Sequence, residues 1–95
     1  MGNQKRMSDE EFDEYLEEYW PFLCHRKGKW GPIDTPEAIS KMTDEHIASS
    51  IAYISKHKKN LRYGGQLPDN PQDLSNLEEL IKLKTAELEK ELQSR

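Results

Sequence analysis

The chain has 95 residues and a net charge of −4, and its hydrophobic and charged fractions are both 34%. This length suits one domain with a modest core, so we expect a single small domain over residues 1–95, with residues 1–7 disordered. No apolar run approaches the roughly 20 residues of a membrane span, and the single cysteine cannot form an internal disulfide, which together indicate a cytoplasmic protein without a membrane partner.

The first predicted helix covers residues 9–20. Ser8 and Glu11 form a capping box at its start, and Pro21 ends it, because the residue before a proline avoids the helical region. The outward face of this helix is strongly acidic and could present carboxylates, in place of nucleic-acid phosphates, to a basic protein. The candidate residues of this protein-binding face are Glu10, Asp13, Glu14, Glu17 and Glu18.

The next segment, residues 21–34, contains two prolines and two glycines and is predicted to be an irregular loop. Whether it holds a short extended piece is left open by the sequence. Thr35 followed by Pro36 is a good helix start and predicts a short helix near 36–41. We find no convincing pair of strands.

Two longer helices follow, near 44–60 and 72–93. The first begins after Thr43, and the second begins with Asn70 as its cap and Pro71 at its first position. The fold class is therefore all-α, a small bundle of three main helices plus one short helix. The apolar stripes that should share one core are Phe12/Leu16/Tyr19, Ile47/Ile51/Ile54 and Leu77/Ile81/Leu88, with Trp20 and Trp30 partly buried over the helix junction.

One flank of the helix at 44–60 carries polar and aromatic side chains stacked at three- and four-residue intervals, including two histidines. In the simpler interpretation these are boundary residues, with apolar bodies against the core and polar tips in water. In the other, they form a shelf for a planar or phosphorylated ligand, with nearby basic residues supplying positive charge. The candidate ligand-binding residues are His25, Arg26, Lys27, Lys29, Trp30, His46, Tyr53, His57, Lys58 and Arg62.

Several chemistries are excluded by spacing. His46 and His57 lie about 16 Å apart along a helix, and neither has a chelating neighbour one turn away. There is no Gly-x-Ser-x-Gly elbow and no phosphate-binding loop. We therefore expect no enzyme, no metal and no cofactor. The acidic helix also argues against general nucleic-acid binding, which calls for a basic domain.

The last helix also predicts assembly. Lys84 interrupts its apolar seam, and a small bundle cannot cover every leucine that the helix carries. Exposed leucines in a row usually mark an interface. We expect a homo-oligomer, most simply a two-fold dimer, with Leu80 and Leu83 at the contact.

The segment from Trp30 through Ile54 follows the pattern W…I-x-x-M-T-D-x-H-[IL], and its matching residues are Trp30, Gly31, Ile39, Met42, Thr43, Asp44, His46 and Ile47. In this it resembles small uncharacterised proteins encoded by bacteriophages and prophages. The chain carries "GPIDTPEA" where that family has a lysine-rich, hairpin-like stretch, which argues against a hairpin here. The resemblance implies a phage origin, hence a place in the host cytoplasm, and it brings no catalytic residues.

Together these features favour a non-enzymatic phage-type protein that blocks or sequesters a host factor. Small phage proteins without enzyme signatures are often directed at host defence, which is an argument by analogy. The partner would be a nucleotide signal held by the basic and histidine residues, or a basic host protein held by the acidic helix. The alternative is a structural or assembly protein that acts through helix-mediated oligomerisation.

Overall fold

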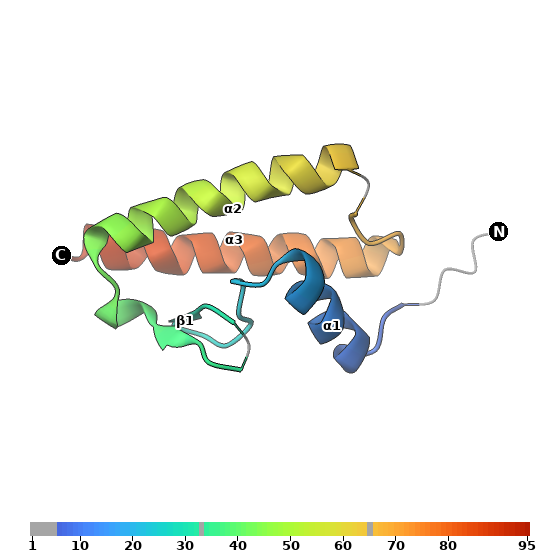
Figure 1. Cartoon of the computed structure of the whole chain (residues 1–95), viewed down its shortest axis with the longest axis horizontal. Helices are drawn as coiled ribbons and strands as arrows, with labels where there is room; N and C mark the ends of the chain where they lie inside the picture. Colours follow the sequence, from blue (N-terminus) through green and yellow to red (C-terminus); the bar gives the residue numbers. More distant parts are fainter. Residues whose placement is uncertain (1–5, 33, 65) are drawn as a thin grey trace.

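A computed structural model describes residues 6–32, 34–64 and 66–95, and the side chains of Arg62 and Tyr63 lie outside the described part. The elements in chain order are α1 (Asp9–Tyr19), β1 (Lys29–Trp30), β2 (Glu37–Ala38), a 3-10 turn η1 (Ile39–Lys41), α2 (Asp44–Gly64) and α3 (Pro71–Gln93). The long helices α2 and α3 lie side by side, while α1 and the short strands form the remaining part of the molecule (Figure 1).

The predicted helix starts are confirmed in atomic detail. The Ser8 hydroxyl accepts a hydrogen bond from the Glu11 amide at 3.2 Å, and the Glu11 carboxylate accepts one from the Ser8 amide at 3.0 Å. The Thr43 hydroxyl caps α2 by accepting from the His46 amide at 3.1 Å. The Asn70 side chain caps α3 in the same way. These contacts satisfy amides that have no partner within their own helix.

A two-stranded hairpin stands where the sequence predicted a loop and a short helix. Lys29 lies opposite Ala38 and Trp30 opposite Glu37 in an antiparallel pair. Gly28 turns into β1 with a φ of +74°, a conformation that favours glycine. The prediction of a helix over 36–41 was wrong except for the turn η1, because the backbone of residues 37–38 pairs with β1. The fold is thus mainly helical with a small sheet, and all-α describes it only coarsely.

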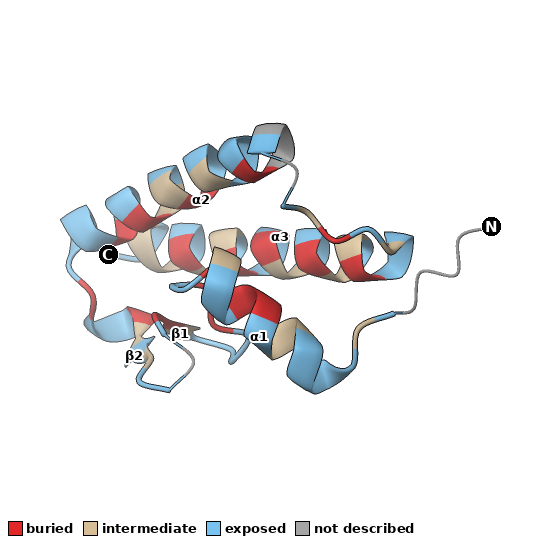
Figure 2. Cartoon of the chain, turned by 45° about the vertical axis from the view of Figure 1, so that its right-hand side comes forward, coloured by how far each residue is buried: buried red, intermediate tan, exposed pale blue. Residues whose placement is uncertain are grey.

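One hydrophobic core joins all three helices, as the apolar stripes predicted (Figure 2). Leu16 of α1, Ile47 of α2 and Leu77 of α3 have no exposed surface. Trp20 and Trp30 are only 1% and 4% exposed, so they are more deeply buried than predicted. Both indoles belong to the core cluster, where large aromatic side chains supply much of the buried area of a small protein.

Lys84 does not interrupt the buried face of α3 but joins it. Its side chain is only 2% exposed, and its amino group donates to the carbonyl oxygens of Arg26 and Lys29, each at 2.8 Å. The same amino group pairs with the Glu87 carboxylate at 2.8 Å, and that carboxylate accepts the Gly28 amide at 3.2 Å. We call Lys84 with Glu87 the lysine anchor. It fastens the turn before β1 onto α3.

The C-terminal end of α3 is tied to the start of α2. The Arg95 guanidinium pairs with Asp44 at 2.8 Å and with Glu91 at 3.2 Å. At the other end of the molecule, the Tyr15 hydroxyl donates to the Gln66 carbonyl oxygen at 2.9 Å, which holds the α2–α3 connection against α1.

Tyr15 makes the stability of the protein dependent on pH in the alkaline range. Burial raises the pKa of Tyr15 from 10.0 to about 12. Below the lower value the phenol is protonated in both states. Between the two values the unfolded chain loses this proton while the folded protein keeps it, so the free energy of unfolding should fall as pH rises through this range.

Tyr15→Phe tests this dependence, since phenylalanine keeps the ring and cannot titrate. Urea denaturation of both proteins at about pH 9 and about pH 11 gives their stability difference at each pH. We expect the free energy of unfolding of the wild type to exceed that of the variant by a smaller margin at the higher pH than at the lower one. A difference that stays constant between the two conditions would contradict the assignment.

Candidate functional site

The candidate ligand-binding residues do not converge on one place. Trp30, His46 and Tyr53 line a shared hollow, whereas His25 and Lys27 border a groove along α3. Lys58 faces a third depression, between α2 and α3. The carbonyls of Arg26 and Lys29 accept from the lysine anchor, and the Arg62 side chain lies outside the described residues. The structure therefore brings Trp30, His46 and Tyr53 together and places His25, Lys27 and Lys58 at other depressions.

His57 is already occupied by contacts within the protein. Its ring stacks on Tyr53 with centroids 5.1 Å apart, and Trp20 meets it edge-on at 4.7 Å. Its Nε2 atom contacts the carbonyl oxygen of Tyr19, one of the last carbonyls of α1, which have no partner inside the helix. The Nε2–H tautomer would donate there. This surrounding fits the simpler interpretation of the histidine as a boundary residue.

Phe22 borders an aromatic hollow that was not predicted from the sequence. Its side chain is 46% exposed, although its ring meets Tyr53 edge-on with centroids 5.9 Å apart. Two adjoining depressions of about 200 and 210 Å³ surround it, both bordered by Trp30 and His46. We call them together the Phe22 hollow. Its remaining lining residues are Gly31, Pro32, Thr35, Glu37, Ser49, Ser50 and Tyr53.

The polar groups at the rim of the Phe22 hollow contact one another. His46 Nδ1 lies 3.3 Å from the Glu37 carboxylate, and both side chains are about half exposed. Ser50 donates its hydroxyl to the backbone carbonyl of His46 at 2.8 Å. The hollow is consequently an apolar, aromatic surface with a paired polar rim, and no lysine or arginine lines it among the described residues.

The acidic face of α1 is exposed, and most of it carries uncompensated charge. Within the described part of the chain, no cation lies at ion-pair distance from Glu10, Glu14, Glu17 or Glu18. Asp13 differs, since it lies 3.3 Å from His25 Nε2. The last turn of α1 contains no basic residue, so the negative end of the helix dipole adds to the field of these carboxylates.

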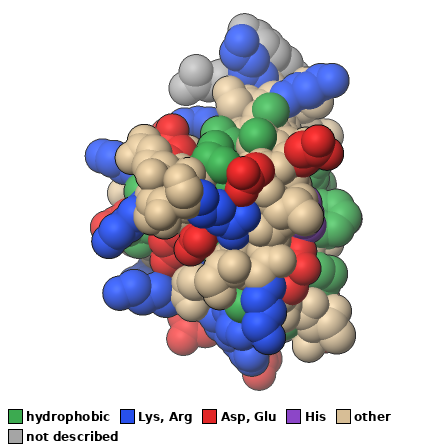
Figure 3. Space-filling model, turned by 90° about the vertical axis from the view of Figure 1, so that its left-hand side faces the viewer, with side chains coloured by type: hydrophobic (Ala, Val, Ile, Leu, Met, Phe, Trp, Pro, Cys, Tyr) green, Lys and Arg blue, Asp and Glu red, His purple; other side chains and the backbone are tan. Residues whose placement is uncertain are grey.

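Within the acidic face, Glu17 and Glu18 lie in the last turn of α1, close in sequence to Phe22, whereas Glu10 lies in the first turn. Glu18 and Phe22 are four positions apart in the chain, a stretch that can span at most about 14 Å. The end of the molecule that holds the hairpin and the start of α2 carries both acidic and basic side chains (Figure 3). We call Phe22, its hollow and the carboxylates of Glu14, Glu17 and Glu18 together the α1–Phe22 region.

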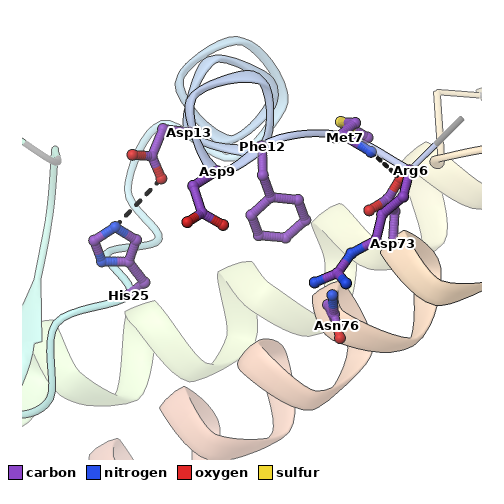
Figure 4. Close-up of a pocket in the computed structure, with 8 residues that line it drawn as sticks. All are labelled: Arg6, Met7, Asp9, Phe12, Asp13, His25, Asp73 and Asn76. Carbon is purple, nitrogen blue, oxygen red and sulfur yellow. Dashed lines mark hydrogen bonds and ion pairs between the residues drawn. The ribbon is translucent and has the colours of Figure 1, made fainter.

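A separate polar cavity of about 240 Å³ lies between α1 and the start of α3 (Figure 4). The Asp73 carboxylate there is 2% exposed and accepts the Met7 amide at 2.8 Å, while His25 pairs with Asp13 across the cavity wall. Among the described residues, no group of three or more histidine, cysteine or acidic side chains could hold a metal ion. The carboxylates of Asp73 and Asp13 thus serve to tie segments together.

The two leucines predicted at an oligomer contact differ in exposure. Leu80 is partly buried and packs against the core, whereas Leu83 is 58% exposed.

No helix within residues 6–32, 34–64 and 66–95 combines the length and apolar content that crossing a membrane requires. Comparison of the chain with models of protein families, with curated proteins and with solved structures finds no match.

Proposed function

We propose that the protein is a non-enzymatic binding protein that takes a basic segment of a partner protein on the α1–Phe22 region. The observation that carries the proposal is Phe22, a large aromatic side chain left 46% exposed over an aromatic hollow. Aromatic anchors seated in such hollows dominate the energetics of many protein interfaces. The uncompensated carboxylates of α1 supply the complementary charge.

The apolar ring of Phe22 and the carboxylates of α1 together indicate which class of partner would bind. A segment carrying lysines or arginines beside an apolar side chain would place the apolar group on Phe22 and the cations on Glu14, Glu17 and Glu18. Charge complementarity of this kind speeds association and suppresses wrong partners more than it adds affinity. The resemblance to phage-encoded proteins supports a protein of the host cytoplasm as the partner, and inhibition of host defence as the purpose, by analogy.

A nucleotide signal is the less favoured ligand. Phosphates call for cations beside a stacking surface, and no lysine in the described part of the chain lines the Phe22 hollow. A thermal-shift panel of cyclic di- and trinucleotides checks this directly, with Lys27→Ala as the variant. A rise in Tm that Lys27→Ala abolishes would overturn the protein-binding proposal in favour of nucleotide sequestration.

The binding test starts with capture of a partner from bacterial lysate and ends with titration of the purified partner by calorimetry. Phe22→Ala should weaken binding about 10- to 100-fold, the range of an interface hot spot. Glu14→Gln with Glu18→Gln should weaken it several-fold at low salt and less at high salt, because rim charges are screened.

The matched control is Glu45→Gln with Asp69→Asn, which removes the same charge from exposed positions outside α1. It should leave the affinity unchanged. A captured partner whose affinity is equal for the wild type, Phe22→Ala and the double glutamine variant would place the working surface elsewhere and refute the proposal.

A further inference from the structure

The outward face of α3 carries a stripe with no role in the core of the chain. The buried face is formed by Asp73, Leu77, Ile81, Lys84 and Leu88. The opposite stripe consists of Glu79, Leu83, Ala86 and Lys90, spaced by four, three and four residues so that they align along the helix. All four are exposed, Leu83 by 58%. We call these residues the outer stripe.

The outer stripe has the shape of a knob beside a recess. Depressions of about 430 and 1060 Å³ flank it on its two sides, and both are lined by Leu83 and Ala86. The small side chain of Ala86 leaves room next to the protruding leucine. Leu80 and Ile81 contribute further apolar surface to the floors of these depressions. The surface could therefore receive a leucine from another molecule.

The outer stripe is self-complementary: when two copies run in opposite directions, acidic residues face basic ones and the leucine faces the alanine. If a second copy of α3 runs antiparallel about a two-fold axis midway between positions 84 and 85, Leu83 faces Ala86 and Glu79 faces Lys90. Each contact then occurs twice, as the isologous interface of a two-fold dimer requires. A parallel pairing would oppose Glu79 to Glu79 and Lys90 to Lys90, which repel each other.

We propose that the protein forms a homodimer through the outer stripes of two antiparallel α3 helices. Each Leu83 enters the recess beside the partner copy's Ala86, and each Glu79 pairs with the partner copy's Lys90. The apolar centre is small, so the dimer is weak and transient. This inference does not depend on the proposed function.

The dimer would present the α1–Phe22 region twice. The residues of that region are absent from the outer stripe, so pairing of α3 helices leaves them available. Two linked copies of a binding site raise the effective affinity for a partner that has repeated sites.

A charge-exchange experiment tests the proposed register. Sedimentation of the wild type up to about 1 mM should show the mass rising from 11.1 kDa toward twice that value. Glu79→Lys and Lys90→Glu should each weaken self-association about 10-fold, because each variant opposes like charges twice. An equimolar mixture of the two variants should associate at least as tightly as the wild type, since every facing pair in the mixed dimer is again opposite in charge.

Two charge reversals outside the outer stripe test whether the effect on self-association is specific to the stripe, and a change at Leu83 tests its apolar centre. Lys59→Glu and Glu17→Lys reverse exposed charges on α2 and α1 and should leave self-association unchanged. Leu83→Glu should abolish it while leaving the circular dichroism intact, and it avoids the loss of core packing that a change at Leu80 would add. A wild type that stays at 11.1 kDa throughout, or a mixture no tighter than the separate variants, would overturn the proposal and leave the stripe to a different partner.

Discussion

Replacing Lys84 with alanine is expected to lower the free energy of unfolding by about 3–5 kcal/mol, the usual cost of breaking a buried ion pair. The substitution removes the donor to the carbonyls of Arg26 and Lys29 and leaves Glu87 without its cation. It also removes an aliphatic stem from a site that is only 2% exposed. Urea denaturation followed by circular dichroism measures the change.

Lys82→Ala is the matched control, because this exposed lysine lies on the same helix and forms no ion pair within the described residues. It should change stability by less than about 0.5 kcal/mol. Lys84→Met keeps most of the stem and separates packing from hydrogen bonding, and it should remain clearly destabilised. If Lys84→Ala were as stable as Lys82→Ala, the lysine anchor would have no energetic role.

Replacing Trp20 with alanine is expected to cost about 3–5 kcal/mol, as for other large aromatic side chains removed from a core. Trp20 is 1% exposed, belongs to the shared core and meets the ring of His57 edge-on. Its removal leaves a space that Leu16 and Leu23 cannot fill without moving the end of α1. Small domains are only marginally stable, so a variant that is already unfolded in buffer would represent the upper part of this range.

Phe22→Ala provides the comparison, because it removes an aromatic ring two residues further along the chain. Its ring is 46% exposed, so its loss should cost less than about 1 kcal/mol. A large loss at position 22 together with a small loss at position 20 would reverse the roles assigned to these two side chains. The mild effect on folding also makes Phe22→Ala usable in the binding experiment.

The helices were predictable because their signals are local. A cap such as Ser8 with Glu11, or Asn70 before Pro71, satisfies its own helix within a few residues, and the apolar stripes have the helical period. The hairpin was not predictable from Thr35 and Pro36, which satisfy the rules for a helix start. What decides the conformation of this segment is the pairing of Glu37 and Ala38 with β1, and that contact spans the turn and depends on the rest of the fold.

In the candidate site, too, local signals were predictable from the sequence and contacts between distant segments were not. Sequence periodicity placed Tyr53 and His57 on one flank, but it could not show that Trp20 and the end of α1 would cover the histidine. Phe22 was missed because it follows Pro21 and lies outside any helical period. The available signal was the run of Phe22, Leu23 and Cys24, which does not by itself show which of the three side chains stays exposed.

The lysine anchor has a consequence for how this chain can diversify. Lys84 and Glu87 recognise the turn through the carbonyls of Arg26 and Lys29 and the amide of Gly28. Every amino acid offers that carbonyl, so the anchor is indifferent to the side chains at 26, 27 and 29, provided that a residue tolerant of positive φ remains at 28. The turn could therefore exchange its basic side chains for others over generations, changing the charge of this surface while the scaffold beneath it stays the same.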